Sequence, residues 1–363
     1  MVKKNYNSRW MPRNRHSRIS NYNSQEKEER MKKYHVYGIG AALVDKEFEV
    51  EDSFFEHESI QKGIMTLVDG ESQNTLLQRL TARFGLKKRA GGGSAANSIY
   101  AVSQFGGNTF FSCKVSNDEF GDFFVEELGH LNIHTNLDQE NRETGVTGKC
   151  LVMVSPDTER TMLTYLGISE TLSKNEIDED ALKNSEYLYL EGYQVTSDSG
   201  REACVHAANI ARQNGVKVAL TLSDPSMVQF FRGGLQEMIG SGIDLLFAND
   251  VEAKEWTGKE TVEEAIEELK KISRQIVVTC GSKGALLFDG AKTISIAPHK
   301  VKAVDSNGAG DMFAGAFLYA VSAGHDFETA GKLASFAAAT TVSHFGPRLP
   351  SEKHAEIKKK VLG

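Results

Sequence analysis

Residues 185–290 repeat one hydrophobic pattern, in which a short apolar run alternates with a longer amphipathic stretch. The apolar runs are typical of buried β-strands, and the amphipathic stretches have the apolar spacing of helices with one buried face. The repeats are SEYLYLEGYQVTS, REACVHAANIARQNGVKVALTLSDPS, FRGGLQEMIGSGIDLLFANDVEAKEW and VEEAIEELKKISRQIVVTCGSKGALLFDG. Strands that alternate with helices predict βαβ units, so we expect one large, doubly wound α/β domain with a mostly parallel sheet flanked by helices.

Two strand-rich segments interrupt this alternation. FEVEDSFFEHESIQKGIMTLV mixes strand-like alternation with short helical stretches, and TGKCLVMVSPDTERTMLTYL alternates like a pair of strands. Because such strands are hard to place in a parallel core, we expect segments at about 46–68 and 146–166 to form a small β-rich lid over the main sheet. The alternative is that they extend the main sheet as an antiparallel edge. A clear helix, ESQNTLLQRLTARFG, follows the first segment.

Composition narrows the class of protein. A chain of 363 residues with 40% hydrophobic and 25% charged residues has the composition of a soluble protein with a large core. No apolar run approaches the ~18 residues of a membrane span, so we expect no membrane partner and predict a cytoplasmic location. Four cysteines lie far apart, without a C-x-x-C pair or histidines at metal-ligand spacing: Cys113, Cys150, Cys204 and Cys280. We expect them to be reduced and mostly buried.

Charge is distributed unevenly along the chain. The formal net charge is −7, but residues 1–33 contain ten Lys or Arg and three Glu, which leaves −14 for the rest. An acidic body argues against nucleic acid as the main partner. Residues 1–33 lack apolar periodicity, so we predict a disordered extension or an extended start site. A transit peptide or an anionic contact surface is the alternative.

The strongest chemical signal lies in VDSNGAGDMFAGAFLYAVSAG, residues 304–324. Gly308, Ala309 and Gly310 are small enough for a ligand to approach the backbone, and apolar residues recur every four positions along a helix that begins here. Asp311 falls in the first helical turn. The unpaired N–H groups of a helix N-terminus can stabilise a transferring phosphoryl group, and a carboxylate beside them can accept the proton of an attacking hydroxyl.

Further polar candidates follow predicted strands. The apolar strand YHVYGIGAALVD is expected to end at Asp45, where a carboxylate can bind sugar hydroxyls. The pattern N-D-V-E, Asn249 to Glu252, is by itself usually a helix N-cap with an acidic first turn. In VVTCGSKGALLF the residues Thr279, Gly281 and Gly284 form a turn that can expose N–H groups to phosphate, although a plain hairpin is the better reading in isolation. A Walker sequence is absent, which excludes a P-loop kinase.

The segment DSNGAGD resembles the D-[TS]-x-G-A-G-D signature of the ribokinase-like (PfkB) carbohydrate kinases, and AGGGSAANS resembles the first signature of that family. The resemblance extends over most of the chain from about residue 34 to residue 363. It implies a ribokinase-like sheet with a small β-rich lid, Asp311 as the catalytic base and the GAG amides as an anion hole. It also implies that Asp45, Gly92, Gly93 and Asn97 bind the acceptor.

The same resemblance implies ATP and Mg²⁺ as cofactors and leaves the need for a monovalent cation open. Asn249 and Glu252 match the family's N-x-x-E motif, in which the Glu holds Mg²⁺ through water. Thr279, Gly281 and Gly284 fall at the family's nucleotide contacts. The Ala-rich helix in FETAGKLASFAAATTVSHFGPRLP falls where the adenine of ATP lies, and His344 is expected beside that nucleotide pocket.

The activity implied is ATP-dependent transfer of the γ-phosphoryl group to a hydroxyl of a sugar or nucleoside. The spelling of the motifs is most similar to the adenosine-kinase branch, in which an aromatic pair stacks on the nucleoside base. Here Tyr193 is followed by Gln194, so either Tyr193 alone supplies the stack or the acceptor is a free sugar of the ribose or fructose type. A catalytically silent nucleotide- or sugar-binding regulator is the alternative of another class. Both a monomer and a homodimer are open.

Overall fold

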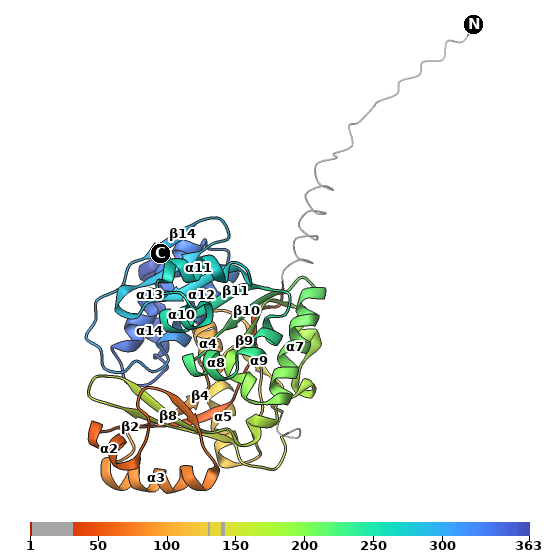
Figure 1. Ribbon diagram of the computed structural model, residues 1–363. Helices are drawn as coiled ribbons and strands as arrows, with labels where there is room; N and C mark the ends of the chain where they lie inside the picture. The colour runs from red at the N-terminus through yellow and green to blue at the C-terminus, as the bar shows by residue number, and fades with distance from the viewer. Residues whose placement is uncertain (2–31, 130, 139–141) are drawn as a thin grey trace.

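The computed structural model describes residues 1, 32–129, 131–138 and 142–363 (Figure 1). In these residues nine strands form a main sheet in the order β14-β13-β12-β11-β10-β9-β1-β5-β6. Its strands are β1 (Tyr34–Ile39), β5 (Thr109–Ser112), β6 (Ile133–Thr135), β9 (Ser185–Glu191), β10 (Lys217–Thr221), β11 (Ile243–Asn249), β12 (Ser273–Thr279), β13 (Ala285–Phe288) and β14 (Thr293–Ile296). All neighbours are parallel except β12–β13 and β13–β14. The predicted mostly parallel α/β fold is confirmed.

Helices cover both faces of the main sheet. Successive side chains of each strand point to opposite faces, so every strand contributes to two separate apolar clusters. Val36 and Leu245 enter one apolar cluster, and their neighbours Tyr37 and Leu246 enter another. The first cluster is completed by α4 (Ser94–Gln104), α5 (Glu119–Gly129), α12 (Ala309–Ser322), α13 (Phe327–Val342) and α14 (Ser351–Leu362). The second is completed by α6 (Glu179–Lys183), α7 (Asp198–Gln213), α8 (Pro225–Phe230), α9 (Arg232–Ile239), α10 (Asp250–Thr257) and α11 (Val262–Leu269). This is a doubly wound arrangement.

The described residues also form short 3₁₀ turns. They are η2 (Gly167–Thr171) and η3 (Lys174–Glu176), which connect β8 (Arg160–Tyr165) of a second, smaller sheet to α6, and η4 (Gly192–Thr196) and η5 (Gly281–Lys283). Two of them, η4 and η5, directly follow β9 and β12, so they lie at the carboxyl edge of the sheet, where ligands bind in folds of this class.

Five described strands form a second, smaller sheet in the order β3-β8-β7-β2-β4, which lies below the main body in Figure 1. They are β2 (Leu43–Glu49), β3 (Met65–Leu67), β4 (Lys88–Gly92), β7 (Gly148–Val154) and β8 (Arg160–Tyr165). Leu151 and Met153 of β7 pack under α2 (Asp52–Glu58) and α3 (Gly70–Phe84), whereas Cys150 and Val152 point to the opposite face. One face of the small sheet is therefore covered by its own helices.

The interrupting strands form this separate sheet, so the alternative of an antiparallel extension of the main sheet is wrong. The sheet is also larger than the two expected segments, because the start of the Gly-rich stretch contributes β4. The prediction of one strand ending at Asp45 is wrong as well. The chain leaves β1 at Ile39 and enters the small sheet at Leu43, so Asp45 lies inside β2. The crossing is tight: a Cβ on Gly40 would lie 2.4 Å from Glu191 Oε2.

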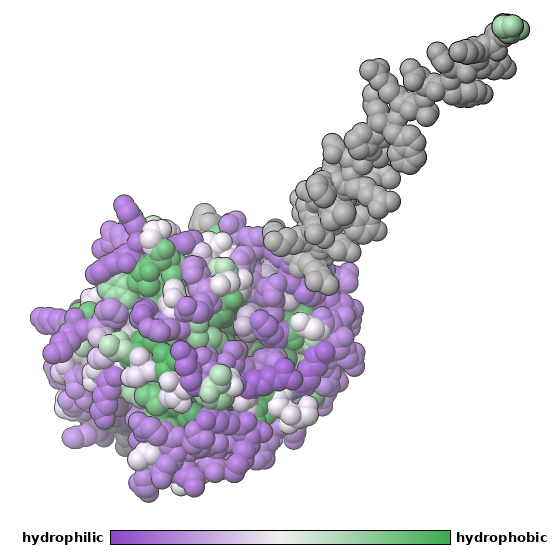
Figure 2. Space-filling model, turned by 90° about the horizontal axis from the view of Figure 1, so that it is seen from above, coloured by the Kyte–Doolittle hydropathy of each residue, from purple (hydrophilic) through white to green (hydrophobic). Residues whose placement is uncertain are grey.

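Hydrophilic residues dominate the surface, and apolar residues gather in the middle of the face seen in Figure 2. Among the residues that can be described, no helix is long and apolar enough to cross a membrane. The four cysteines are free, and all but Cys280 are buried. The extension predicted for residues 1–33 lies, apart from Met1, Lys32 and Lys33, outside the described residues.

Candidate active site

A pocket of ≈ 650 Å³, including solvent at its mouth, opens between the two sheets at the carboxyl edge of the main sheet. Its lining combines polar groups from the main body with apolar groups from the small sheet. The residues are Ala41, Leu43, Asp45, Met65, Leu67, Gly93, Ser94, Asn97, Cys150, Arg160, Met162, Thr164, Leu166, Glu191, Tyr193, Thr196, Ser223, Asn307 and Asp311.

Asp311 stands in the first turn of α12 with its carboxylate on the pocket floor. Ser94 Oγ donates to Oδ1 at 2.7 Å and Asn97 Nδ2 donates to Oδ2 at 3.0 Å, so both oxygens are held from α4. Burial raises the pKa of Asp311, and the positive charge of Arg160 opposes that shift. The result is an oriented carboxylate that is more basic than an exposed aspartate.

The backbone before Asp311 is the segment predicted to supply an anion hole. Gly308 has φ +71° and a Cβ there would lie 2.5 Å from Pro347, so the turn requires glycine. Ala309 N–H donates to Ser306 O at 3.3 Å. The N–H groups of Gly310 and Asp311 find no backbone acceptor within the described part of the chain, and the face of Gly310 where a Cβ would project is open. Both N–H groups are thus available to an anion.

Asp45 and the glycine run Gly91–Gly93 lie close together, because β2 and β4 are adjacent strands of the small sheet. Leu43 to Glu47 pair with Lys88 to Gly92. A Cβ on Gly92 would lie 2.0 Å from Asp45 Oδ1, so the carboxylate occupies the space that glycine leaves. Gly93 has φ +100°, and a Cβ there would lie 2.1 Å from Ala41 O. Burial raises the pKa of Asp45 to about 7. Asp45 is 5% exposed and lines the pocket, although it lies inside β2 and not at the end of the predicted strand.

Several polar residues of this site were not singled out from the sequence. Arg160 of β8 lines the pocket and donates through Nη1 to Asn307 Oδ1 at 2.9 Å. Glu191, at the end of β9, is 1% exposed and accepts the N–H of Ala95 at 2.7 Å. Burial raises the pKa of Glu191 to about 7. A single Arg or Glu within a strand forms no sequence motif, and only the packing of the two sheets brings Arg160 and Glu191 to the pocket.

Tyr193 lies in η4 and its side chain lines the pocket. Its hydroxyl lies 3.4 Å from Ser223 O and 3.5 Å from Asp224 Oδ2, so the ring is held at the pocket wall. Gln194 is 5% exposed and is not part of the lining. The residue that departs from the adenosine-kinase pattern is therefore turned into the interior.

The candidates on the nucleotide side lie outside the lining of this pocket. Asn249 caps α10 in a reciprocal capping box, in which Glu252 Oε1 and Oε2 accept from the Asn249 side chain (2.6 Å) and backbone N–H (3.0 Å). Glu252 is 4% exposed, and burial raises its pKa to about 7. In the described residues no group of three His, Cys, Asp or Glu side chains could hold a metal directly.

Thr279 ends β12, and Gly281 and Gly284 lie in the turn that joins it to the antiparallel strand β13, so the stretch is a hairpin as its pattern predicted. Gly281 is exposed, whereas Gly284 is buried and a Cβ there would lie 2.1 Å from Ile296 O. His344 follows α13, and its Nδ1 lies 2.8 Å from Thr340 O. Their contacts with a nucleotide remain a prediction.

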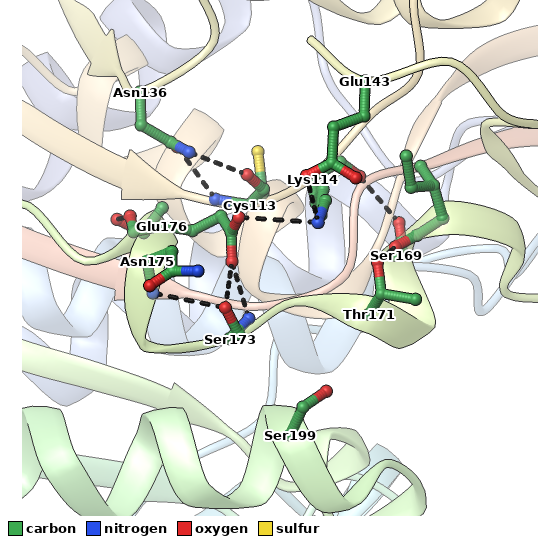
Figure 3. Close-up of polar contacts among 12 residues, drawn as sticks. Cys113, Lys114, Asn136, Glu143, Ser169, Thr171, Ser173, Asn175, Glu176 and Ser199 are labelled. Carbon is green, nitrogen blue, oxygen red and sulfur yellow. Dashed lines mark hydrogen bonds and ion pairs between the residues drawn. The ribbon is translucent and has the colours of Figure 1, made fainter. Parts of the chain in front are cut away.

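A polar network fixes the chain where it passes between the sheets (Figure 3). Ser169 Oγ lies 2.9 Å from both Ala42 O and Lys114 O. The Lys114 ammonium lies 2.8 Å from Glu143 Oε1 and 3.6 Å from Glu176 Oε1, with one carboxylate on each side. Lys114 and Glu176 are each only 12% exposed, so their pair is shielded from bulk solvent, whereas the Glu143 side chain is 62% exposed. The connection at Ala42, next to the pocket, is thereby tied to the main body.

Comparison with known proteins identifies the family. The model of the pfkB family carbohydrate kinases matches residues 73–354. The chain is 24% identical over 334 residues to adenosine kinase from Saccharomyces cerevisiae, covering 87% of this chain and 96% of the relative. It is 28% identical over 267 residues to 5-dehydro-2-deoxygluconokinase from Clostridium perfringens, covering 69% and 78%. The crystal structure of adenosine kinase from Sinorhizobium meliloti matches with a TM-score of 0.84 and 32% identity, covering 90% of this chain and 99% of the other.

The chain therefore belongs to the pfkB family of carbohydrate kinases, as its motifs predicted. Members of this family, adenosine kinases and sugar kinases among them, are carbohydrate or nucleoside kinases, so the protein is an enzyme of this class. Kinases of the family use ATP, usually with Mg²⁺.

Proposed function

We propose that the enzyme transfers the γ-phosphoryl group of ATP to a hydroxyl group of a nucleoside, with a free sugar as the second candidate acceptor. The observation that carries this proposal is the Asp311 carboxylate, which Ser94 and Asn97 orient at the pocket floor beside the available N–H groups of Gly310 and Asp311. A base and an anion hole at one helix N-terminus suit phosphoryl transfer to an alcohol.

Each polar group of the pocket has a role in this proposal. Asp311 accepts the proton of the attacking hydroxyl, and Asp45 and Asn97 hold neighbouring hydroxyls of the acceptor. The N–H groups of Gly310 and Asp311 stabilise the charge that builds on the transferred phosphoryl oxygens. Arg160, which reaches the pocket from the small sheet, adds a positive charge to the same oxygens. The small sheet forms one wall of the pocket, and we expect it to help exclude water from the phosphoryl group.

ATP would lie outside the acceptor pocket, along the carboxyl ends of β11 and β12. Thr279, Gly281, Gly284 and His344 are the candidates for its contacts. Both Glu252 oxygens accept hydrogen bonds from Asn249, so this carboxylate suits a hydrated Mg²⁺ better than a directly ligated one. When bound, Mg²⁺ neutralises charge on the phosphates.

The wall of the pocket favours a nucleoside over a free sugar. Five apolar residues on its small-sheet side lie beside the polar Asp45, Arg160 and Thr164: Leu43, Met65, Leu67, Met162 and Leu166. Tyr193 adds an aromatic ring on the side of the main body. A free sugar presents hydroxyls that an apolar wall leaves without partners, whereas the flat base of a nucleoside matches apolar and aromatic side chains.

A regulator that has lost catalysis is the competing function of another class. It needs an anion site but no base, and the Asp311 carboxylate is held by two hydrogen bonds at the place where a base is required. This arrangement favours a kinase over a regulator.

The test is Mg²⁺-dependent ADP formation from ATP with a panel of adenosine, inosine, guanosine, ribose, fructose and phosphorylated fructose. We expect turnover with a nucleoside, and Tyr193→Leu should raise the nucleoside KM while leaving the KM for ATP unchanged. Tyr165→Leu is the matched control, because this ring lies against Gly70 and outside the pocket lining. Turnover with free sugars only would overturn the nucleoside assignment. Tight ATP binding without transfer to any acceptor would support the regulator.

A further inference from the structure

Behind the acceptor pocket lies a buried arginine that the kinase reaction described above does not use. Arg348 follows α13 in the loop GPRLP, and its side chain is 7% exposed. Nε donates to Asn97 Oδ1 at 2.9 Å and Nη1 donates to Glu127 Oε2 at 2.9 Å. The guanidinium also lies over the Tyr100 ring, 4.6 Å from its centroid. Arg348 is absent from the pocket lining, so it reaches the acceptor only through its neighbours.

The contacts of Arg348 determine which end of the Asn97 amide faces the pocket. A guanidinium can only donate hydrogen bonds, so it requires the amide oxygen. The ionised Asp311 carboxylate can only accept, so it requires the amide nitrogen, which lies 3.0 Å from Oδ2. With Oδ1 committed to Arg348 and one N–H committed to Asp311, the remaining N–H is the group that Asn97 can offer to an acceptor hydroxyl.

Glu127 holds Arg348 in this position and joins it to the glycine run. Its Oε2 accepts from Arg348 Nη1 and also from the backbone N–H of Gly91 at 2.6 Å. A Cβ on Gly91 would lie 2.6 Å from Glu127 Oε2 and 2.8 Å from Arg348 Nη1. The absence of a side chain at Gly91 thus lets the ion pair pack against the strand that carries Gly92 and Gly93.

We propose that Arg348, held by Glu127, is a positioning residue of the kinase: it orients the Asn97 amide, and through Asn97 the Asp311 carboxylate, for attack by the acceptor hydroxyl. The proposal rests on the function proposed above. Charge supports it, because the positive charges of Arg160 and Arg348 both oppose the effect of burial on the pKa of Asp311. A buried arginine fork is suited to the task, since its two donors have a fixed geometry that a lysine lacks.

The test is a double-mutant cycle on turnover, with Arg348→Met, Asn97→Ala and the combined variant, and with kcat measured as a function of pH. We expect Arg348→Met to lower kcat roughly 10- to 100-fold, as the loss of a charge-assisted hydrogen bond does. The KM for ATP should stay unchanged. The acid limb of the kcat profile should move to higher pH, because removing a positive charge raises the pKa of the base.

Two further variants separate positioning from plain stability. Arg348→Lys keeps the charge but cannot reach Asn97 and Glu127 together, so we expect the wild-type acid limb with reduced kcat. Arg212→Met is the matched control, because Arg212 is a partly buried arginine that donates to Ile239 O and Gly242 O away from the pocket. It should leave both kcat and the acid limb unchanged.

In the Asn97→Ala background, Arg348→Met should cost little further turnover, because the group through which Arg348 acts is gone. Equal losses in both backgrounds would overturn the proposal, as would a variant with lower thermal stability but a wild-type kcat and pH profile. A wild-type enzyme that transfers phosphate to no acceptor would instead overturn the proposed function, and this inference with it.

Discussion

Glu47 is a buried carboxylate whose replacement should change how the stability of the protein depends on pH. It lies on β2, two residues after Asp45, and is 0% exposed. Neither of its carboxylate oxygens has a hydrogen-bond partner among the residues described. Burial, and after it the charge of Asp45, raises the pKa of Glu47 from 4.5 to about 8. The substitution Glu47→Gln keeps the size of the side chain and removes its titration.

The expected size and sign follow from the two pKa values. Because the pKa is raised in the folded state, the folded protein retains a proton that the unfolded chain releases. Stability from Glu47 is complete below about pH 4.5 and is lost as the pH rises to about 8. Between the two pKa values the loss is at most about 1.4 kcal/mol per pH unit and is smaller close to either pKa, so from pH 5 to pH 8 it amounts to roughly 3 kcal/mol. The neutral Gln variant does not have this loss.

The assay is reversible urea unfolding of wild type and Glu47→Gln at pH 5, 6, 7 and 8. The difference between the two free energies of unfolding should grow with pH in favour of the variant, by roughly 3 kcal/mol over this range. Glu49→Gln is the control, because Glu49 is an exposed residue of the same strand. A difference that is constant from pH 5 to pH 8 would refute the reasoning, since it would mean that Glu47 titrates alike in the folded and unfolded states.

Three further predictions concern the active site. Gly92→Ala should raise the KM for the acceptor and leave the KM for ATP unchanged, because the new Cβ would lie 2.0 Å from Asp45 Oδ1 and displace that carboxylate. Equal changes in both KM values would contradict this prediction. Turnover of the wild type should fall as the pH drops through about 7, because burial raises the pKa of Asp45 to about 7 and also raises that of Asp311, and both residues act in their ionised form. A flat profile down to pH 5 would speak against these roles. Arg160→Met should lower kcat roughly 100-fold, the effect of losing one group that stabilises transition-state charge, and an unchanged kcat in a steady-state assay would remove Arg160 from that role.

The parts of the fold that repeat a local pattern could be predicted from the sequence. The βαβ alternation after residue 185 gave the parallel sheet, and the helix that begins at the GAG motif was visible from its apolar spacing. The path of the chain near Asp45 could not be predicted, because YHVYGIGAALVD has no charged residue before Asp45 and nothing in its hydrophobic pattern marks the change of sheet at Gly40. That change depends on the close approach of Gly40 to Glu191, about 150 residues away in the sequence.

The candidate site shows the same division. Asp311 and Asn97 belong to recognisable motifs, and the structure brings them within hydrogen-bond distance of each other. Arg160 and Arg348 belong to no motif singled out in the sequence, and their relation to Asp311 depends on tertiary packing alone. Sequence patterns locate groups that share a local segment, whereas buried charge pairs from distant segments require the folded structure.

Asp311 is the residue on which the proposed mechanism depends most directly. The decisive measurement is kcat for ADP formation by Asp311→Asn with ATP, Mg²⁺ and the best acceptor of the panel. Asp198→Asn is the control, because Asp198 also stands in a first helical turn but is exposed. We predict normal folding with kcat lower by roughly 10²- to 10⁴-fold, the usual contribution of a positioned base, and an unchanged KM for ATP. Near-normal kcat in Asp311→Asn would show that Asp311 is not the base and would contradict the mechanism.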